Sequence, residues 1–209
     1  MTYLLRTSIR SVTLDVPDLT AAGAFYSDAF GLGDQLRLRA TDAPTTGFRG
    51  FMLSLMVSQP STVSGLIDAA VDAGAATLKP AATSMFGYGG VVQAPDGTVW
   101  KIATAATNDS GPATRRIDQI VLLLGAEDVA ASTQFYVGRG LGVAKNFGST
   151  YVEFASPWSP VKLALSRRPA LADDAGVALD GTGSHRLSIG STAGAFTDPD
   201  GFAWEAASA

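Results

Sequence analysis

Alternating apolar and polar residues predict a β-strand followed by a helix near the start of the chain. Residues 8–16 alternate and are rich in β-branched side chains, a pattern typical of a half-buried strand. Asp18 is placed to accept hydrogen bonds from the first free amides of a helix that runs to about Phe30. Gly31 and Gly33 are expected to end that helix, because glycine readily adopts the left-handed conformation of a helix stop.

The same periodicity predicts the rest of the first half. Residues 35–39 and 48–58 are expected to be strands, and residues 61–74 carry apolar side chains at helical spacing. Pro95-Asp96-Gly97 has the chemistry of a hairpin turn, since Pro fixes φ and Gly tolerates a positive φ. The two strands that it joins are expected at 91–94 and 98–103.

The chain contains one pattern written twice. Residues 9–33 and 117–142 both pass from a β-rich run through Asp and an Ala-rich stretch to Phe-Tyr, and both close on Gly-Leu-Gly. Residues 89–102 and 194–206 both contain Pro-Asp-Gly followed, three residues after the Gly, by Trp. Because the signatures recur in the same order, two modules are predicted. The modules are expected at 1–104 and 115–209 with a polar linker at 105–114, and the matching strands of the second half at 151–155, 161–166 and 186–190.

Composition narrows the class of protein. The chain is 46% hydrophobic and 16% charged, which is enough apolar material for a folded core. It has no cysteine, so disulfides, thiolate nucleophiles and cysteine-based zinc sites are excluded. No apolar run reaches the ~20 residues of a membrane span, and the N-terminus lacks the layout of a signal peptide. The net charge of −4 and the scattered basic residues argue against nucleic acid. A cytoplasmic protein with a small-molecule partner is expected.

These motifs resemble the vicinal-oxygen-chelate superfamily of glyoxalases, bleomycin-resistance proteins and extradiol dioxygenases. The resemblance rests on the strand, the Ala-rich helix ending in Phe-Tyr, Gly-Leu-Gly and the closing Asp-Pro-Asp-Gly-x-x-x-Glu, and it covers both halves. It implies an α+β fold of two tandem βαβββ modules whose curved mixed sheets form a cup. The superfamily includes lyases, isomerases, dioxygenases and drug-binding proteins, so the fold alone does not select a reaction.

The resemblance also implies where a metal would sit. In the superfamily, inward-facing residues on the first and last strand of each module, typically His, Gln or Glu, hold a divalent ion. The positions that match here are Ser11, Lys101, Gln119 and Glu205. A serine is a poor ligand, and a protonated lysine has no lone pair and repels a cation. We therefore expect a cup without metal or other cofactor. A divalent metal would be needed only for the alternative function, a metal-dependent lyase, isomerase or dioxygenase.

Two interpretations of Lys101 and Glu205 stay open on sequence grounds. In the first, they face each other as a partly buried ion pair on the floor of the cup, and are the catalytic candidates, Glu205 as base and Lys101 as electrophile. In the second, Lys101 extends to solvent and Glu205 caps an edge. His185, the single histidine, has no visible catalytic partner and is interpreted as structural.

Apolar and small residues are expected to line the cup. Trp100 and Trp204 precede Lys101 and Glu205, so by strand alternation they should face the core instead. The loop at 85–90 could close over a flat ligand or be anchored by hydrophobic plugs, and 42–46 and 170–182 are further candidates for mobile loops. The ligand-binding candidates on the cup face are Ser11, Thr13, Gln119 and Val121, and those of the apolar lining are Phe48, Phe51, Met52, Met56, Met85, Phe86, Tyr88 and Trp158.

Three functions remain. The first is metal-independent binding of a small apolar or aromatic molecule, which we favour. The second is a metal-dependent lyase, isomerase or dioxygenase, and the third is a metal-free enzyme that uses Glu205 as a base. Glyoxalase I activity itself is not expected. Both a single chain and a homodimer are compatible with two modules.

Overall fold

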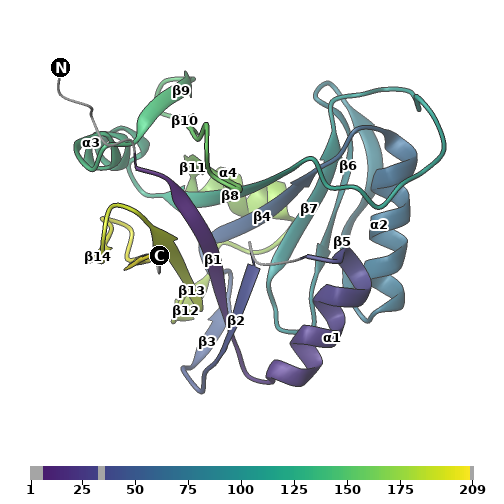
Figure 1. The fold of residues 1–209 in the computed structure, drawn as a ribbon, viewed down its shortest axis with the longest axis horizontal. Coiled ribbons are helices and arrows are strands. Elements are labelled where there is room, and N and C mark those ends of the chain that lie inside the picture. The colour runs from purple at the N-terminus through teal and green to yellow at the C-terminus, as the bar shows by residue number, and fades with distance from the viewer. Residues whose placement is uncertain (1–6, 33–35, 208–209) are drawn as a thin grey trace.

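The computed structural model describes residues 7–32 and 36–207 as a mixed α+β structure. Its strands form sheets of eight, five and two strands, with helices packed against them (Figure 1). The predicted fold class is thereby confirmed. No helix in the described part of the chain is long and apolar enough to cross a membrane.

The eight-stranded sheet contains two complete βαβββ units. The first consists of β4 (Phe51–Met56), α2 (Pro60–Asp72), β5 (Ala76–Ser84), β6 (Gly87–Gln93) and β7 (Val99–Thr104). The second consists of β8 (Gln119–Ala126), α3 (Val129–Gly138), β9 (Gly142–Asn146), β10 (Tyr151–Ala155) and β11 (Val161–Arg167). The sheet order is β5-β6-β7-β4-β8-β11-β10-β9, so the two units meet where β4 pairs antiparallel with β8.

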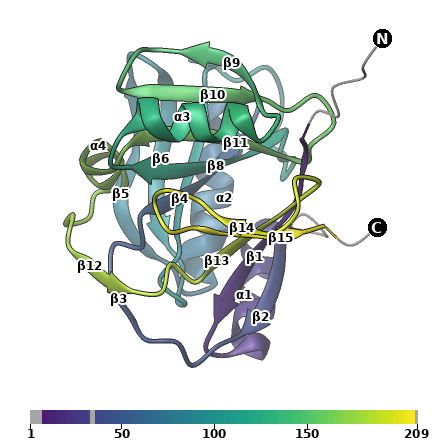
Figure 2. The same ribbon diagram turned by 90° about the vertical axis from the view of Figure 1, so that its left-hand side faces the viewer.

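The five-stranded sheet combines the two ends of the chain. It contains β1 (Ile9–Val16) and β2 (Leu36–Ala40), which α1 (Leu19–Phe30) connects, together with β13 (Leu187–Ser191), β14 (Phe196–Thr197) and β15 (Ala203–Ala206). Its order is β14-β15-β13-β1-β2, and β1 pairs antiparallel with β13 (Figure 2). Both large sheets therefore draw strands from both halves of the sequence repeat, and the predicted boundary at 105–114 runs between strands that share a sheet.

Local predictions for the helices and turns hold. Asp18 caps α1 by accepting hydrogen bonds from the amides of Thr20 and Ala21, and Gly31 ends the helix with a φ of 60°. Asp128 caps α3 in the same way. The two Pro-Asp-Gly turns join the antiparallel pairs β6–β7 and β14–β15. Gly33 and Gln35 lie outside the described residues.

The repeated Phe-Tyr and Pro-Asp-Gly motifs meet in space. The Tyr26 hydroxyl of α1 donates to Asp96 Oδ2 at 2.7 Å, and its ring lies 5.5 Å from that of Trp100. In the second half, Tyr136 of α3 donates to Asp198 and its ring lies 5.4 Å from that of Trp204. Each contact ties a helix to the hairpin that closes its half. Both tryptophans are buried, as alternation predicts.

The core has two parts on opposite faces of the eight-stranded sheet. The larger cluster joins the α1, α2 and α3 side of this sheet to the buried face of the five-stranded sheet. The smaller cluster lies on the other face, where Met52, Val91 and Val99 meet Leu171 and Ala175. The last two residues belong to α4 (Arg168–Ala175), which packs against β4, β7, β8 and β11.

Helix α4 corrects the interpretation of residues 170–182 as a loop. Pro169 stands in the first turn of the helix, and Gly176 ends it in a left-handed conformation with a φ of 75°. A proline in the first turn and a glycine at the end are ordinary signals of a helix. The helix has only eight residues, and its apolar side packs against the sheet. Residues 45–47 and 181–183 are not free loops either, because they pair as β3 (Thr45–Gly47) and β12 (Gly181–Gly183).

The buried tyrosine contacts predict an asymmetric effect on stability. Replacing Tyr136 by Phe removes a hydrogen bond to Asp198, which is only 6% exposed, so we expect a loss of about 1–3 kcal/mol in the free energy of unfolding. Tyr26→Phe should cost less, about 0.5–1.5 kcal/mol, because its partner Asp96 is only half-buried and reaches water. Urea denaturation of both variants at neutral pH measures the two losses. A loss for Tyr26→Phe equal to or above that for Tyr136→Phe would contradict the argument from burial.

Candidate functional site

One face of the eight-stranded sheet is available for a site. Trp100 and Leu53 point into the main core, so their neighbours Lys101 and Ser54 point to the opposite side. We call this opposite side, which carries Met52, Ser54, Val91, Val99, Lys101 and Val121, the cup face. Helix α4 covers its centre.

Lys101 lies on the cup face, and its partner is a residue that the sequence did not suggest. Its Nζ atom lies 2.8 Å from both carboxylate oxygens of Asp174 in α4. Register pairing places Lys101 beside Ser54, Ser54 beside Val121 and Val121 beside Lys162. These four residues occupy the first and last strands of the two βαβββ units, in one row across the sheet.

Glu205 lies in the other large sheet, so of the two interpretations the one in which Lys101 and Glu205 form an ion pair is wrong. Its Oε1 accepts from Arg39 Nη1 at 2.7 Å, and Arg39 also binds Asp15 and the Ser188 hydroxyl. The hydrogen bond from Arg39 lowers the pKa of Glu205 below its ordinary value. A lowered pKa makes Glu205 a weaker base, which argues against its predicted catalytic role.

The residues present do not fit a divalent metal. The row on the cup face offers one hydroxyl and two ammonium groups, from Ser54, Lys101 and Lys162. In the five-stranded sheet, Glu205 is already paired with Arg39, and Ser11 lies beside Gly190. No group of three or more His, Asp or Glu side chains suited to a metal occurs in residues 7–32 and 36–207. Transition metals in proteins need several neutral imidazoles or carboxylates, so the donor set disfavours a metal centre.

The remaining polar candidates are separated by the fold. Ser11 and Thr13 belong to β1 of the five-stranded sheet, where Thr13 pairs with Ser188. Gln119 begins β8, and its side-chain amide donates to the carbonyls of Ile120 and Pro160 at the end of the sheet. Val121 alone of these four lies in the row with Lys101.

The aromatic candidates do not form a common lining either. Phe51 is buried in the main core and contacts Phe202 edge to face. The Tyr88 hydroxyl lies 3.2 Å from Ser64 Oγ of α2, which places the ring on the helix side of the sheet. Phe86 and Trp158 are 83% and 81% exposed. Phe86 and Tyr88 are among the residues that line one cavity of the cup face, Phe51 is among those that line the other, and Trp158 lines neither.

Two cavities of about 300 Å³ each lie at opposite ends of the cup face, on either side of the contact between α4 and the sheet. The first, the Lys101 cavity, has a floor of small residues at Gly87, Gly89 and Ala103 and includes Asp174. A side chain at Gly89 would come within 3.0 Å of the Ala103 Cβ, so glycine keeps this floor open. The other lining residues include Lys79, Pro80, Thr83 and Phe86.

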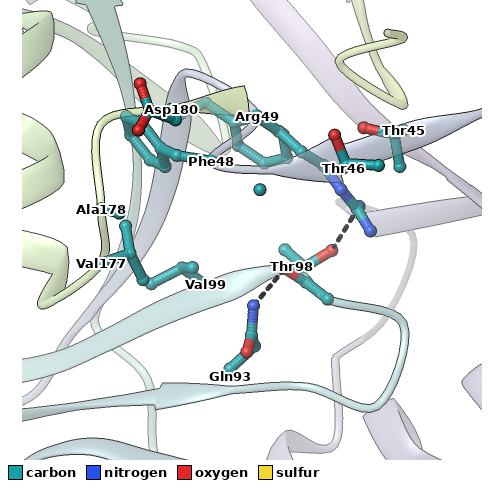
Figure 3. A pocket seen from close by; sticks show the side chains of 13 residues that line it. Thr45, Thr46, Phe48, Arg49, Gln93, Thr98, Val99, Val177, Ala178 and Asp180 are labelled. Carbon is teal, nitrogen blue, oxygen red and sulfur yellow. Dashed lines mark hydrogen bonds between the residues drawn. The ribbon is translucent and has the colours of Figure 1, made fainter. Parts of the chain in front are cut away.

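The second cavity, the Arg49 cavity, lies by the Pro-Asp-Gly turn of the first half. Figure 3 shows Phe48, Val99 and Val177 on one side of it and Arg49, Thr46 and Thr98 on the other. Burial lowers the pKa of Arg49 from its ordinary value. The backbone of Arg49 is fixed by the single histidine, because the carbonyl oxygen lies 2.6 Å from His185 Nδ1. The predicted structural role of His185 agrees with this contact.

Three charged residues of these sites were missed by the sequence analysis: Arg39, Arg49 and Asp174. Arg49 carried a signal, since it is a lone charge at the start of the apolar run 48–57. The sequence signal for Asp174 is weaker: the residue lies in a segment that begins with Pro169 and ends at Gly176, which is a pattern typical of a short helix. No sequence pattern indicates the role of Arg39, since its partners Asp15, Ser188 and Glu205 are distant in sequence.

Comparison with known proteins rests on structure. No protein-family model matches the chain, and no curated protein matches its sequence. Glyoxalase I from Zea mays superposes with a TM-score of 0.61 at 14% identity, covering 95% of this chain and 91% of the maize chain. Its V278E mutant superposes with a TM-score of 0.59 at the same identity, covering 95% and 91%. A glyoxalase-related enzyme from Fulvimarina pelagi is 23% identical over 51% of this chain and 99% of its own, with a TM-score of 0.39 that carries no weight.

At these identities the likeness defines the fold and not the reaction. The fold that the sequence motifs imply is thus confirmed, and this chain has the fold of glyoxalase I.

Proposed function

We propose that this protein binds a small, mainly apolar molecule in the Lys101 cavity without the help of a metal ion. The observation that carries the proposal is the cavity of about 300 Å³ on the cup face, with a floor of Gly87, Gly89 and Ala103 and a single ion pair in its wall. Small-molecule sites are concave, mostly apolar and furnished with a few placed polar groups. The volume lies at the lower end of the usual range of roughly 300–1,000 Å³, which suits a compact ligand.

The ion pair gives the cavity a polar orientation. Lys101 and Asp174 retain exposed fractions of 32% and 42%, so both charges are hydrated and the pair itself adds little stability, about 0–1 kcal/mol. A ligand hydroxyl, carbonyl or amide group can replace water on either charge. The apolar body of the ligand would then cover the small residues of the floor.

The alternative functions have less support. A metal-dependent lyase, isomerase or dioxygenase would need donors that neither sheet gathers among the described residues. An acid–base enzyme using Glu205 and Lys101 would need the two groups in one site, yet they bind Arg39 and Asp174 in different sheets. A cytoplasmic location and a homodimer stay predictions from sequence.

Metal content is the first expected outcome. Protein purified without a chelator should contain far less than one equivalent of iron, zinc, manganese or nickel, because Lys101 and Lys162 occupy the row where donors would be needed. Elemental analysis of the purified chain measures this directly, with no assay of activity. About one bound equivalent would overturn the metal-free part of the proposal.

Ligand binding is the second expected outcome. The neutral dye N-phenyl-1-naphthylamine should bind saturably with enhanced fluorescence, and Ala103→Leu should weaken its binding at least ~10-fold by filling the floor. Ala203→Leu is the matched control, since Ala203 is exposed on the five-stranded sheet. Circular dichroism checks that both variants are folded. Equal dye affinity in the two variants would place the binding elsewhere and remove support for the Lys101 cavity.

A further inference from the structure

The Arg49 cavity contains a guanidinium group whose pKa is lowered by burial and raised by the nearby Asp96 carboxylate, although the two side chains form no ion pair in the described part of the chain. Within residues 7–32 and 36–207, Arg49 takes part in no ion pair with Asp or Glu. Its hydrogen bonds go to the Asp96 carbonyl oxygen and, at 3.5 Å, to Thr98 Oγ1. A guanidinium has five N–H donors, so three lack an acceptor in the described part of the chain. A partly buried cation is costly without a partner.

The hairpin turn holds this guanidinium in a fixed place. Gly97 has a φ of +88°, and a Cβ at this position would lie 2.7 Å from Arg49 Nη2. The glycine therefore allows the side chain of Arg49 to lie against the turn. With its backbone held through His185 and its Nη2 atom held by the Asp96 carbonyl, Arg49 presents its planar group in a defined direction.

The wall opposite Arg49 is apolar. Phe48, Val99 and Val177 form it, and the hydroxyls of Thr46 and Thr98 lie on the Arg49 side (Figure 3). Asp180 is exposed at the rim, and in this view its carboxylate lies away from the guanidinium. The cavity thus combines one unpaired cation, neighbouring hydroxyl groups and a hydrophobic surface.

We propose that the Arg49 cavity is a second binding site, for small monocarboxylates with an apolar body. The carboxylate would accept hydrogen bonds from Arg49, because guanidinium donors match the geometry of carboxylate oxygens. The apolar body would pack against Phe48, Val99 and Val177. This site is separate from the Lys101 cavity and does not depend on the function proposed for it.

The charge count favours a monocarboxylate over a phosphate ester. A phosphate monoester carries close to two negative charges, about −1.5 to −2 near neutral pH. The cavity offers a single lining cation and has the Asp180 carboxylate at its rim. A monoanion matches the one guanidinium, whereas a dianion would place an uncompensated negative charge near the carboxylates of Asp96 and Asp180.

The test compares benzoate with its neutral isostere benzamide by NMR titration of the full chain labelled with nitrogen-15. Benzoate should bind saturably with shifts at the amides of Thr46, Thr98 and Ala178, and benzamide should bind at least ~10-fold more weakly. Arg49→Met should weaken benzoate at least ~10-fold, whereas Arg10→Met, which removes an exposed arginine from β1, should leave the affinity unchanged. Phenyl phosphate should bind more weakly than benzoate.

Two further variants keep the test decisive. Ala178→Trp obstructs the cavity at an exposed loop position and leaves Arg49 in place, so it should abolish benzoate binding even if Arg49→Met is unstable. Ala103→Leu should not affect benzoate, which separates this site from the Lys101 cavity. The proposal is overturned if benzamide binds as tightly as benzoate, if Ala178→Trp binds benzoate normally, or if neither benzoate nor isobutyrate binds saturably up to tens of millimolar.

Discussion

Antiparallel pairing between β4 and β8 is the contact on which both cavities depend. It runs through six consecutive register pairs, from Phe51–Leu124 to Met56–Gln119, and joins the two βαβββ units into one sheet. Because alternate residues of a strand face the same side, this register decides which side chains reach the cup face. A shift of β4 by one residue against β8 would bury Ser54 in the main core and turn Leu53 towards α4.

Helix α4 then determines what kind of site the cup face can offer. Its apolar residues Leu171, Ala172 and Ala175 pack over the centre of the sheet, where a larger ligand would otherwise lie. Space remains at the two ends of this contact, and each end has its own charge: the Lys101–Asp174 pair at one and unpaired Arg49 at the other. The same helix that stabilises the face therefore leaves only small cavities on it and separates two cavities that differ in charge.

Cations also decide the chemistry that the fold can support. Lys101 and Lys162 share a row on the cup face, and Arg39 binds Glu205 and Asp15 in the five-stranded sheet. Lys101 could be recognised from sequence, because its position after the Pro-Asp-Gly turn is fixed by local spacing. Its partner could not, since Asp174 is 73 residues away and belongs to a short helix without a clear apolar periodicity. Glu205 likewise lies on the strand where local spacing places it, but its partner is Arg39 from a distant strand.

The sequence by itself determined the features that rest on short-range interactions. Helix caps such as Asp18, the Pro-Asp-Gly hairpins and the inward direction of Trp100 follow from hydrogen bonds and alternation within a few residues. Tertiary structure decided which strands from the two halves share a sheet, where α4 packs and which charges meet. These outcomes depend largely on contacts between residues far apart in the sequence, such as Lys101 and Asp174 at a separation of 73 positions, and local sequence patterns do not specify such contacts. The fold class could therefore be predicted from the sequence, whereas the residues of the candidate site are brought together by long-range packing.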